Sequence, residues 1–165
     1  MSEELKSSPH SEALHEGASE LRRFARALVG PVSTRTADAL AQTAIVRIEA
    51  ADRLGEDPVE RAFAEIVRLN RRRVRERGRA AESAEISGEN ERRDASVANQ
   101  ISAMPLDERE SLLIIALAGY GYEAAARILD LPVSSVVSRL MRARARLDGA
   151  RPGVAPRGGH LRVVK

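Results

Sequence analysis

Aromatic side chains are scarce in this chain, which restricts how its core can be built. The 165 residues include two phenylalanines, two tyrosines and no tryptophan. Leucine, isoleucine, valine and alanine must therefore fill the interior, and alanine and arginine also rank high in helix propensity. This composition favours helices packed on helices over sheets, so we expect an all-α protein.

Several classes of site are disfavoured by the residues that are missing. Without cysteine the chain has no disulfide and no thiolate metal site, and its three histidines are scattered. The start is acidic and polar, unlike a signal peptide. The longest apolar run, 112–118, is far shorter than the ~18 residues that span a bilayer. We therefore expect a cytoplasmic protein with no cofactor, no metal and no membrane contact.

Apolar residues recur at three- and four-residue intervals in two blocks separated by a polar, acidic stretch. This pattern predicts two small helical domains, at 16–79 and 97–149, joined by a flexible linker at 80–96. The remaining segments, 1–15 and 150–165, read as a flexible tail and a basic tail. The predicted helices run over about 16–29, 36–51, 59–77, 106–118, 122–129 and 133–147, with a further helical start near 97.

Two of the predicted helices in the first block have a defined apolar face. The spacing puts Leu40, Thr43, Ala44 and Ile48 on the buried side of the second helix. The third helix buries Phe63, Ile66 and Val67 in the same way, with Val74 as a further candidate. Asp57 before Pro58 predicts a capped start for that helix.

The last two predicted helices have the pattern of a helix-turn-helix. A short helix with small side chains is followed by a tight turn and a longer basic helix, the arrangement that lays a second helix in the major groove. Apolar residues of that helix form one stripe: Val136, Leu140, Ala143 and Leu147. The opposite face carries Ser135, Ser138, Arg139 and Arg142. Serine can bind phosphates and arginine can bind guanine, so these four are candidate DNA-binding residues.

This second block is similar to region 4 of bacterial sigma factors of the extracytoplasmic-function (ECF) type, group 4 of the sigma-70 family. About 45 residues match without a gap, and the matching positions are Met104-Pro105, Arg109-Glu110, Leu112 to Leu117, Gly119, Tyr122-Glu123, Ala126, Leu131-Pro132 and Ser138-Arg139. The resemblance implies a domain that reads the −35 promoter element and contacts the β flap of RNA polymerase. Asp130 stands where the family often has glycine, and Val137 where it usually has arginine.

The end of the third predicted helix is densely basic. Seven arginines lie within twelve residues, at 68, 71, 72, 73, 75, 77 and 79, offset only by Glu76. Such a cluster neutralises phosphates whatever the base sequence. The alternative is a solubilising helix end whose arginines stabilise the C-terminal dipole, but seven exceed what that role needs.

The first block resembles region 2 of the same family. Asp38, Leu40 and Gln42 match part of an acidic signature on the second helix, although Thr43 replaces a usual glutamate. The resemblance implies that this helix binds the β′ coiled coil of RNA polymerase. It also implies that the third helix engages the −10 element, and the residues concerned are Asn70, Arg71, Arg72, Arg73 and Arg75.

These features predict an ECF-type sigma factor, with the general-stress-response subgroup as a candidate. Its partners would be core RNA polymerase, promoter DNA and an anti-sigma factor. Two alternatives stay open: a sigma-like mimic that sequesters an anti-sigma factor, and a plain helix-turn-helix transcription regulator. No catalytic arrangement or phosphate-binding loop is evident, so we do not expect an enzyme.

Overall fold

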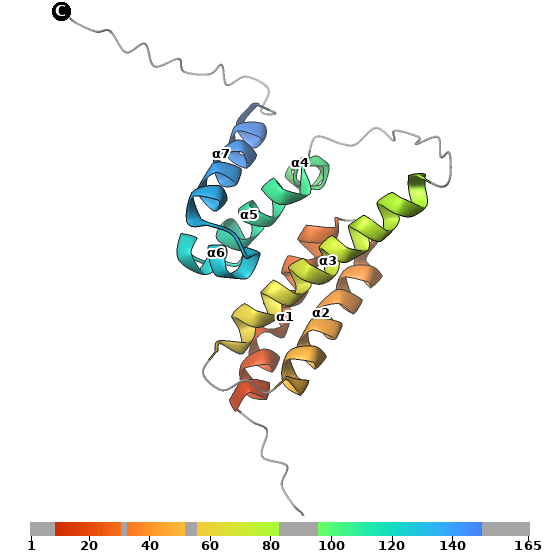
Figure 1. Ribbon diagram of the computed structural model, residues 1–165, viewed down its shortest axis with the longest axis vertical. Helices are drawn as coiled ribbons and strands as arrows, with labels where there is room; N and C mark the ends of the chain where they lie inside the picture. The colour runs from red at the N-terminus through yellow and green to blue at the C-terminus, as the bar shows by residue number, and fades with distance from the viewer. Residues whose placement is uncertain (1–8, 31–32, 52–55, 83–95, 150–165) are drawn as a thin grey trace, which may run out of the picture.

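The structure is a computed structural model that describes residues 9–30, 33–51, 56–82 and 96–149 (Figure 1). Every regular element in these ranges is a helix, so the all-α prediction is confirmed. The helices are α1 (Pro9–Val29), α2 (Thr34–Ala50), α3 (Pro58–Glu82), α4 (Val97–Ala103), α5 (Leu106–Ala116), α6 (Tyr122–Leu129) and α7 (Val133–Gly149). No helix in the described part of the chain is long and apolar enough to cross a membrane.

Helices α1, α2 and α3 lie side by side in one bundle (Figure 1). Phe24 of α1 meets Phe63 of α3 edge to face, with 5.0 Å between ring centroids. The side chain of Asp57 accepts a hydrogen bond of 2.9 Å from the backbone N–H of Val59, so the predicted cap of α3 is present. The chain leaves α1 through Gly30, whose φ of +98° suits glycine.

The buried face of α2 differs from the prediction. Its buried residues are Ala37, Ala41, Ala44 and Ile45, whereas Thr43 is exposed and bonds back to a carbonyl of its own helix. Alanine has so little bulk that α2 can approach its neighbours closely along this line. The larger Leu40 is left at the edge of the contact, where it is half-buried.

Helix α1 begins at Pro9, seven residues before the predicted start at residue 16. The prediction of a flexible tail is therefore wrong for residues 9–15. Leu14 is completely buried there, and the hydroxyl of Ser11 donates a hydrogen bond of 3.2 Å to Glu49 of α2. Helix α3 likewise continues to Glu82, into the predicted linker. The rest of that linker (83–95), residues 1–8 and residues 150–165 lie outside the described residues.

Helices α4 to α7 form a second group that packs against the first (Figure 1). The side chain of Ser96 caps α4, and Met104, Leu112, Leu140 and Ala143 form a small core between α4, α5 and α7. Asp130 makes the turn between α6 and α7 with φ at +55°, the left-handed conformation that aspartate tolerates.

One hydrophobic core runs through both groups of helices. It joins Phe24 and Phe63 to Ile114 of α5 and Leu129 of α6. Tyr120, in the loop between α5 and α6, packs edge to face on Phe63 with 5.3 Å between centroids. Burial raises the pKa of the Tyr120 phenol to about 12, and the neighbouring carboxylates of Asp57 and Glu60 add to the rise. The two predicted domains thus share an interface in this conformation.

Candidate nucleic-acid interface

Helix α7 presents one apolar side to the protein, as the sequence predicts. Val136, Leu140 and Ala143 are buried and Leu147 is half-buried. They pack on α5 and α6, so α6 and α7 form a helix-turn-helix whose second helix is anchored along this stripe. Within the described part of the chain, most residues on the opposite side of α7 are exposed.

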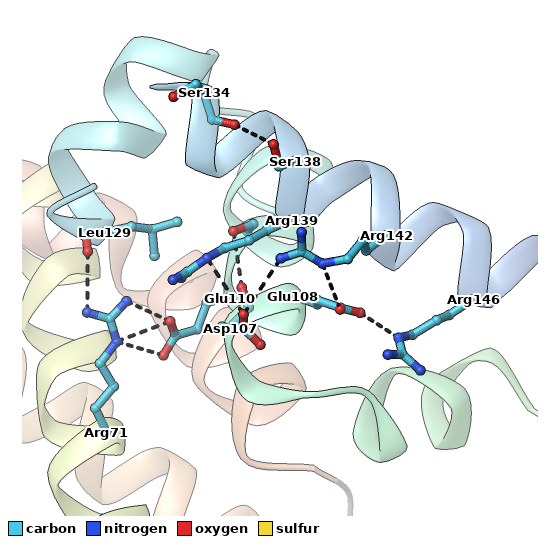
Figure 2. Close-up of polar contacts among 11 residues, drawn as sticks. Arg71, Asp107, Glu108, Glu110, Leu129, Ser134, Ser138, Arg139, Arg142 and Arg146 are labelled. Atoms are coloured by element: carbon cyan, nitrogen blue, oxygen red, sulfur yellow. Dashed lines mark hydrogen bonds and ion pairs between the residues drawn. The ribbon is translucent and has the colours of Figure 1, made fainter. Parts of the chain in front are cut away.

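The two arginines predicted to bind DNA lie toward α5 (Figure 2). The side chain of Arg139 is only 23% exposed, and its Nε lies 3.7 Å from Asp107. Arg142 is 54% exposed and donates from Nε to Glu108 at 3.2 Å. Arg146, one turn further along, donates to the other oxygen of Glu108 at 2.6 Å. The carboxylates of α5 thus partly neutralise this edge of α7.

The outermost part of α7 differs from the predicted face. Ser138 is exposed, but Ser135 is half-buried. The hydroxyl of Ser138 donates to the backbone carbonyl of Ser134 at 2.8 Å (Figure 2). Met141 is 66% exposed, and sequence reasoning did not select it. The sequence could have indicated Met141, because it lies three residues after Ser138 and residues three and four apart share a helix face.

The basic run of α3 is divided between the interior and the surface. Asn70 is buried, and its amide oxygen accepts hydrogen bonds of 2.9 and 3.3 Å from Arg73. Arg72 and Arg75 are exposed, and Arg72 pairs with Glu76 on the same helix. Val74, a candidate for burial in the sequence, is also exposed, at 41%. The predicted −10 residues therefore do not form one continuous surface in this conformation.

Arg71 connects the two groups of helices (Figure 2). It donates to both oxygens of Glu110 of α5 at 2.7 to 3.1 Å, and to the backbone carbonyl of Leu129 of α6 at 3.3 Å. The side chain of Glu110 is only 1% exposed. Burial raises the pKa of Glu110, and the guanidinium of Arg71 offsets part of that rise.

Two further arginines join the groups of helices. Arg109 of α5 donates to the carbonyl of Leu28 at the end of α1 at 2.9 Å, where a cation suits the helix dipole. Arg127 of α6 makes two hydrogen bonds, of 2.8 and 3.0 Å, to Glu60 of α3. Hydrogen bonds from arginines therefore connect the two groups of helices at several points around the shared core.

The predicted polymerase-binding residues lie on α2. Asp38 accepts two hydrogen bonds, of 3.0 and 3.1 Å, from Arg26, which lowers the pKa of its carboxyl group. Gln42 is exposed and Leu40 is half-buried. Val46 is exposed further along the same helix, so this part of α2 offers both polar and apolar groups.

Residues 94–147 match the family model described as "Sigma-70, region 4". The match covers the helix-turn-helix and the two helices before it. A relative from Rhodopseudomonas palustris (strain TIE-1), "ECF RNA polymerase sigma factor EcfG", is 38% identical over 48 residues. These residues make up 29% of this chain and 26% of the relative, so the chain spans about a quarter of the relative's length.

Two solved structures from Bartonella quintana share the fold. The sigma factor RpoE, in complex with the anti-sigma factor NepR, superposes with a TM-score of 0.71 at 22% identity, over 84% of this chain and 94% of that one. The anti-anti-sigma factor PhyR, also with NepR, gives a TM-score of 0.60 at 17% identity, over 84% of this chain and 49% of that one. Residues 94–147 are thus similar to region 4 of the sigma-70 family, and the chain as a whole shares the fold of these two structures.

Proposed function

We propose that this chain acts as a sigma factor that directs RNA polymerase to promoters with a −35 and a −10 element. The observation that carries the proposal is the helix-turn-helix within the region 4 match. Its second helix, α7, is anchored by one apolar stripe and exposes serines and arginines on its other sides. The residues of this helix proposed to contact the −35 element are Ser135, Ser138, Arg139 and Arg142.

Contact with a −10 element by the predicted residues of α3 requires the two groups of helices to separate. Asn70, Arg71 and Arg73 lie at or beneath the interface with α5 and α6. Arg72 and Arg75 are already exposed and can approach phosphates first. In this proposal the described conformation is the closed form, and binding to polymerase and promoter opens it.

The proposed polymerase contacts are on the outer surface of α2. Asp38, Leu40 and Gln42 would meet the β′ coiled coil, and the region 4 part would meet the β flap. Such a protein works in the cytoplasm. The EcfG relative and the RpoE–NepR structure support an ECF-type sigma factor that has an anti-sigma partner, and the general-stress-response branch stays a prediction from the sequence.

A sigma mimic is the second candidate. The fold is also shared with PhyR, an anti-anti-sigma factor in complex with NepR, and the interface covers part of the proposed −10 surface. Such a protein would bind an anti-sigma factor of the NepR kind through sigma-like surfaces without opening promoters.

Transcription from a promoter library separates these candidates. Core RNA polymerase with the full chain is given templates whose −35 and −10 regions are randomised, and the transcripts are sequenced. A sigma factor yields transcripts that start downstream of one enriched pair of elements, and Arg142→Ala reduces them. A mimic yields no chain-dependent transcript but binds an anti-sigma factor. A plain helix-turn-helix regulator binds DNA without polymerase.

A further inference from the structure

The outward side of α7 is uncharged along its centre. Ser134, Ser138, Met141 and Ala145 follow one another at intervals of four, three and four residues, which puts them on one helix face, and all four are exposed. Met141 is the large apolar side chain on this face, and it is 66% exposed. Val137, which is half-buried, lies beside Met141 on the same side. The centre of this face is therefore made of methyl, thioether and hydroxyl groups.

Arginines flank this centre on both edges. Arg142 and Arg146 lie on the edge next to α5, where Glu108 holds both. Positions 142 and 144 are about 200° apart around a helix of 3.6 residues per turn, so Arg144 lies toward the opposite edge. Arg144 is exposed and makes no ion pair with any residue in the described ranges. The face is thus basic at its two edges and uncharged between them.

This charge arrangement matches the major groove of duplex DNA. The groove admits one helix, with phosphates along both rims and base edges on its floor. Arginines at the two edges of α7 can approach the two rims, which brings the uncharged centre over the bases. The apolar group that bases present in the major groove is the 5-methyl group of thymine.

We infer that Val137 and Met141 read thymine methyl groups in the upstream promoter element, an inference that rests on the proposed function. Arg139, the arginine nearest the centre in the predicted face, is largely covered and lies beside Asp107. Specificity at the centre of α7 therefore comes from apolar contact with thymine. The arginines at the edges supply affinity that does not depend on base sequence.

Replacing thymine by uracil tests this directly, since it removes the methyl group and keeps the base pair. The upstream element is first selected from randomised duplexes by core RNA polymerase carrying the full chain. Each thymine of the selected element is then changed to uracil, one at a time, and the duplexes compete for the holoenzyme. At one or two positions uracil should weaken binding about fourfold, the effect of losing one buried methyl group.

Variants of exposed residues complete the test, and none of them disturbs the core. Met141→Ala should bring the ratio of affinities for the thymine and uracil duplexes to about one at the base that Met141 contacts. Met141→Leu should preserve the wild-type ratio. Arg144→Ala is the matched control, and it should weaken binding to all sequences while leaving the ratio unchanged. If the wild-type protein binds the thymine and uracil duplexes equally well at every position, the inference is overturned. Enrichment of an upstream element in the selection would still support the proposed sigma factor. If no element is enriched above core polymerase alone, both fail.

Discussion

Replacing Arg71 by methionine should weaken the closed conformation in a pH-dependent way. The change keeps most of the aliphatic stem but removes the only cation hydrogen-bonded to Glu110 in the described part of the chain. Leaving one member of a buried ion pair without its partner costs about 3–5 kcal/mol. Because Arg71 itself is one-third exposed, we expect the lower end, about 3 kcal/mol near pH 7.

The sign of the pH dependence follows from the pKa of Glu110. Burial already raises this pKa, and loss of Arg71 removes the main effect that offsets the rise. When the pKa of a carboxyl group is higher in the folded than in the unfolded protein, the group contributes most to stability at pH values below its pKa in the unfolded protein. This contribution is lost as the pH rises through its pKa in the folded protein. The variant should therefore approach wild-type stability as the pH falls.

Urea unfolding followed by circular dichroism, at several pH values between neutral and acidic, measures this effect. Arg72→Met is the matched control, because Arg72 pairs with Glu76 on the exposed side of the same helix, where such pairs contribute at most about 0.5 kcal/mol. The double variant Arg71→Met/Glu110→Gln should recover part of the loss at pH 7. A loss at pH 7 below about 1 kcal/mol, or one that does not change with pH, would refute the reasoning.

Three further changes test other parts of the structure. Glu108→Gln removes the carboxylate that holds Arg142 and Arg146, so binding to non-specific duplex DNA should tighten at low salt. A plot of log affinity against log salt should become steeper by about one for each additional phosphate that the freed arginines neutralise, and an unchanged slope would contradict this. Asp130→Val puts a β-branched residue at φ +55° and should lower the free energy of unfolding by about 1–2 kcal/mol, with Asp130→Gly as the tolerated control. Leu14→Ala should cost about 2–4 kcal/mol because Leu14 is fully buried; a cost near zero would mean that residues 9–15 do not pack in solution.

The helix-turn-helix could be predicted closely because its signals are local. The bounds of α6 agree with the prediction, and α7 begins at the predicted residue and extends two residues further than expected. The buried stripe of α7 follows directly from helical spacing. Aspartate at residue 130 adopts the left-handed conformation that the turn requires.

The errors in the first block arose where neighbouring helices decide which residues are buried. The start of α1 contains one large apolar residue, Leu14, in a polar stretch, so its periodicity is too weak to predict a helix. On α2 the sequence favours the large Leu40, but the structure buries Ala37 and Ala41 because small side chains allow close approach. Neither the start of α1 nor the buried face of α2 can be predicted without knowing which helix packs against it.

The contacts between the two groups of helices could not be predicted at all. Arg71 and Glu110 are 39 positions apart, on either side of a predicted linker. A run of seven arginines looks uniform in the sequence, yet Arg71 meets a buried carboxylate while Arg72 is exposed. Similarly, the carboxylates of Asp107 and Glu108 pair with Arg139 and Arg142 on one edge of α7, whereas Met141 on the adjacent face is exposed.

Permanganate reactivity of promoter DNA tests the central claim most directly, because permanganate oxidises thymines that have lost their stacking in an opened duplex. The DNA is the promoter selected from the randomised library, or the library itself, incubated with core RNA polymerase and the full chain. The proposed sigma factor predicts reactive thymines in the −10 region only when chain and core are both present. Unreactive thymines, with the chain still bound to an anti-sigma factor of the NepR kind, would contradict it and identify the protein as a mimic.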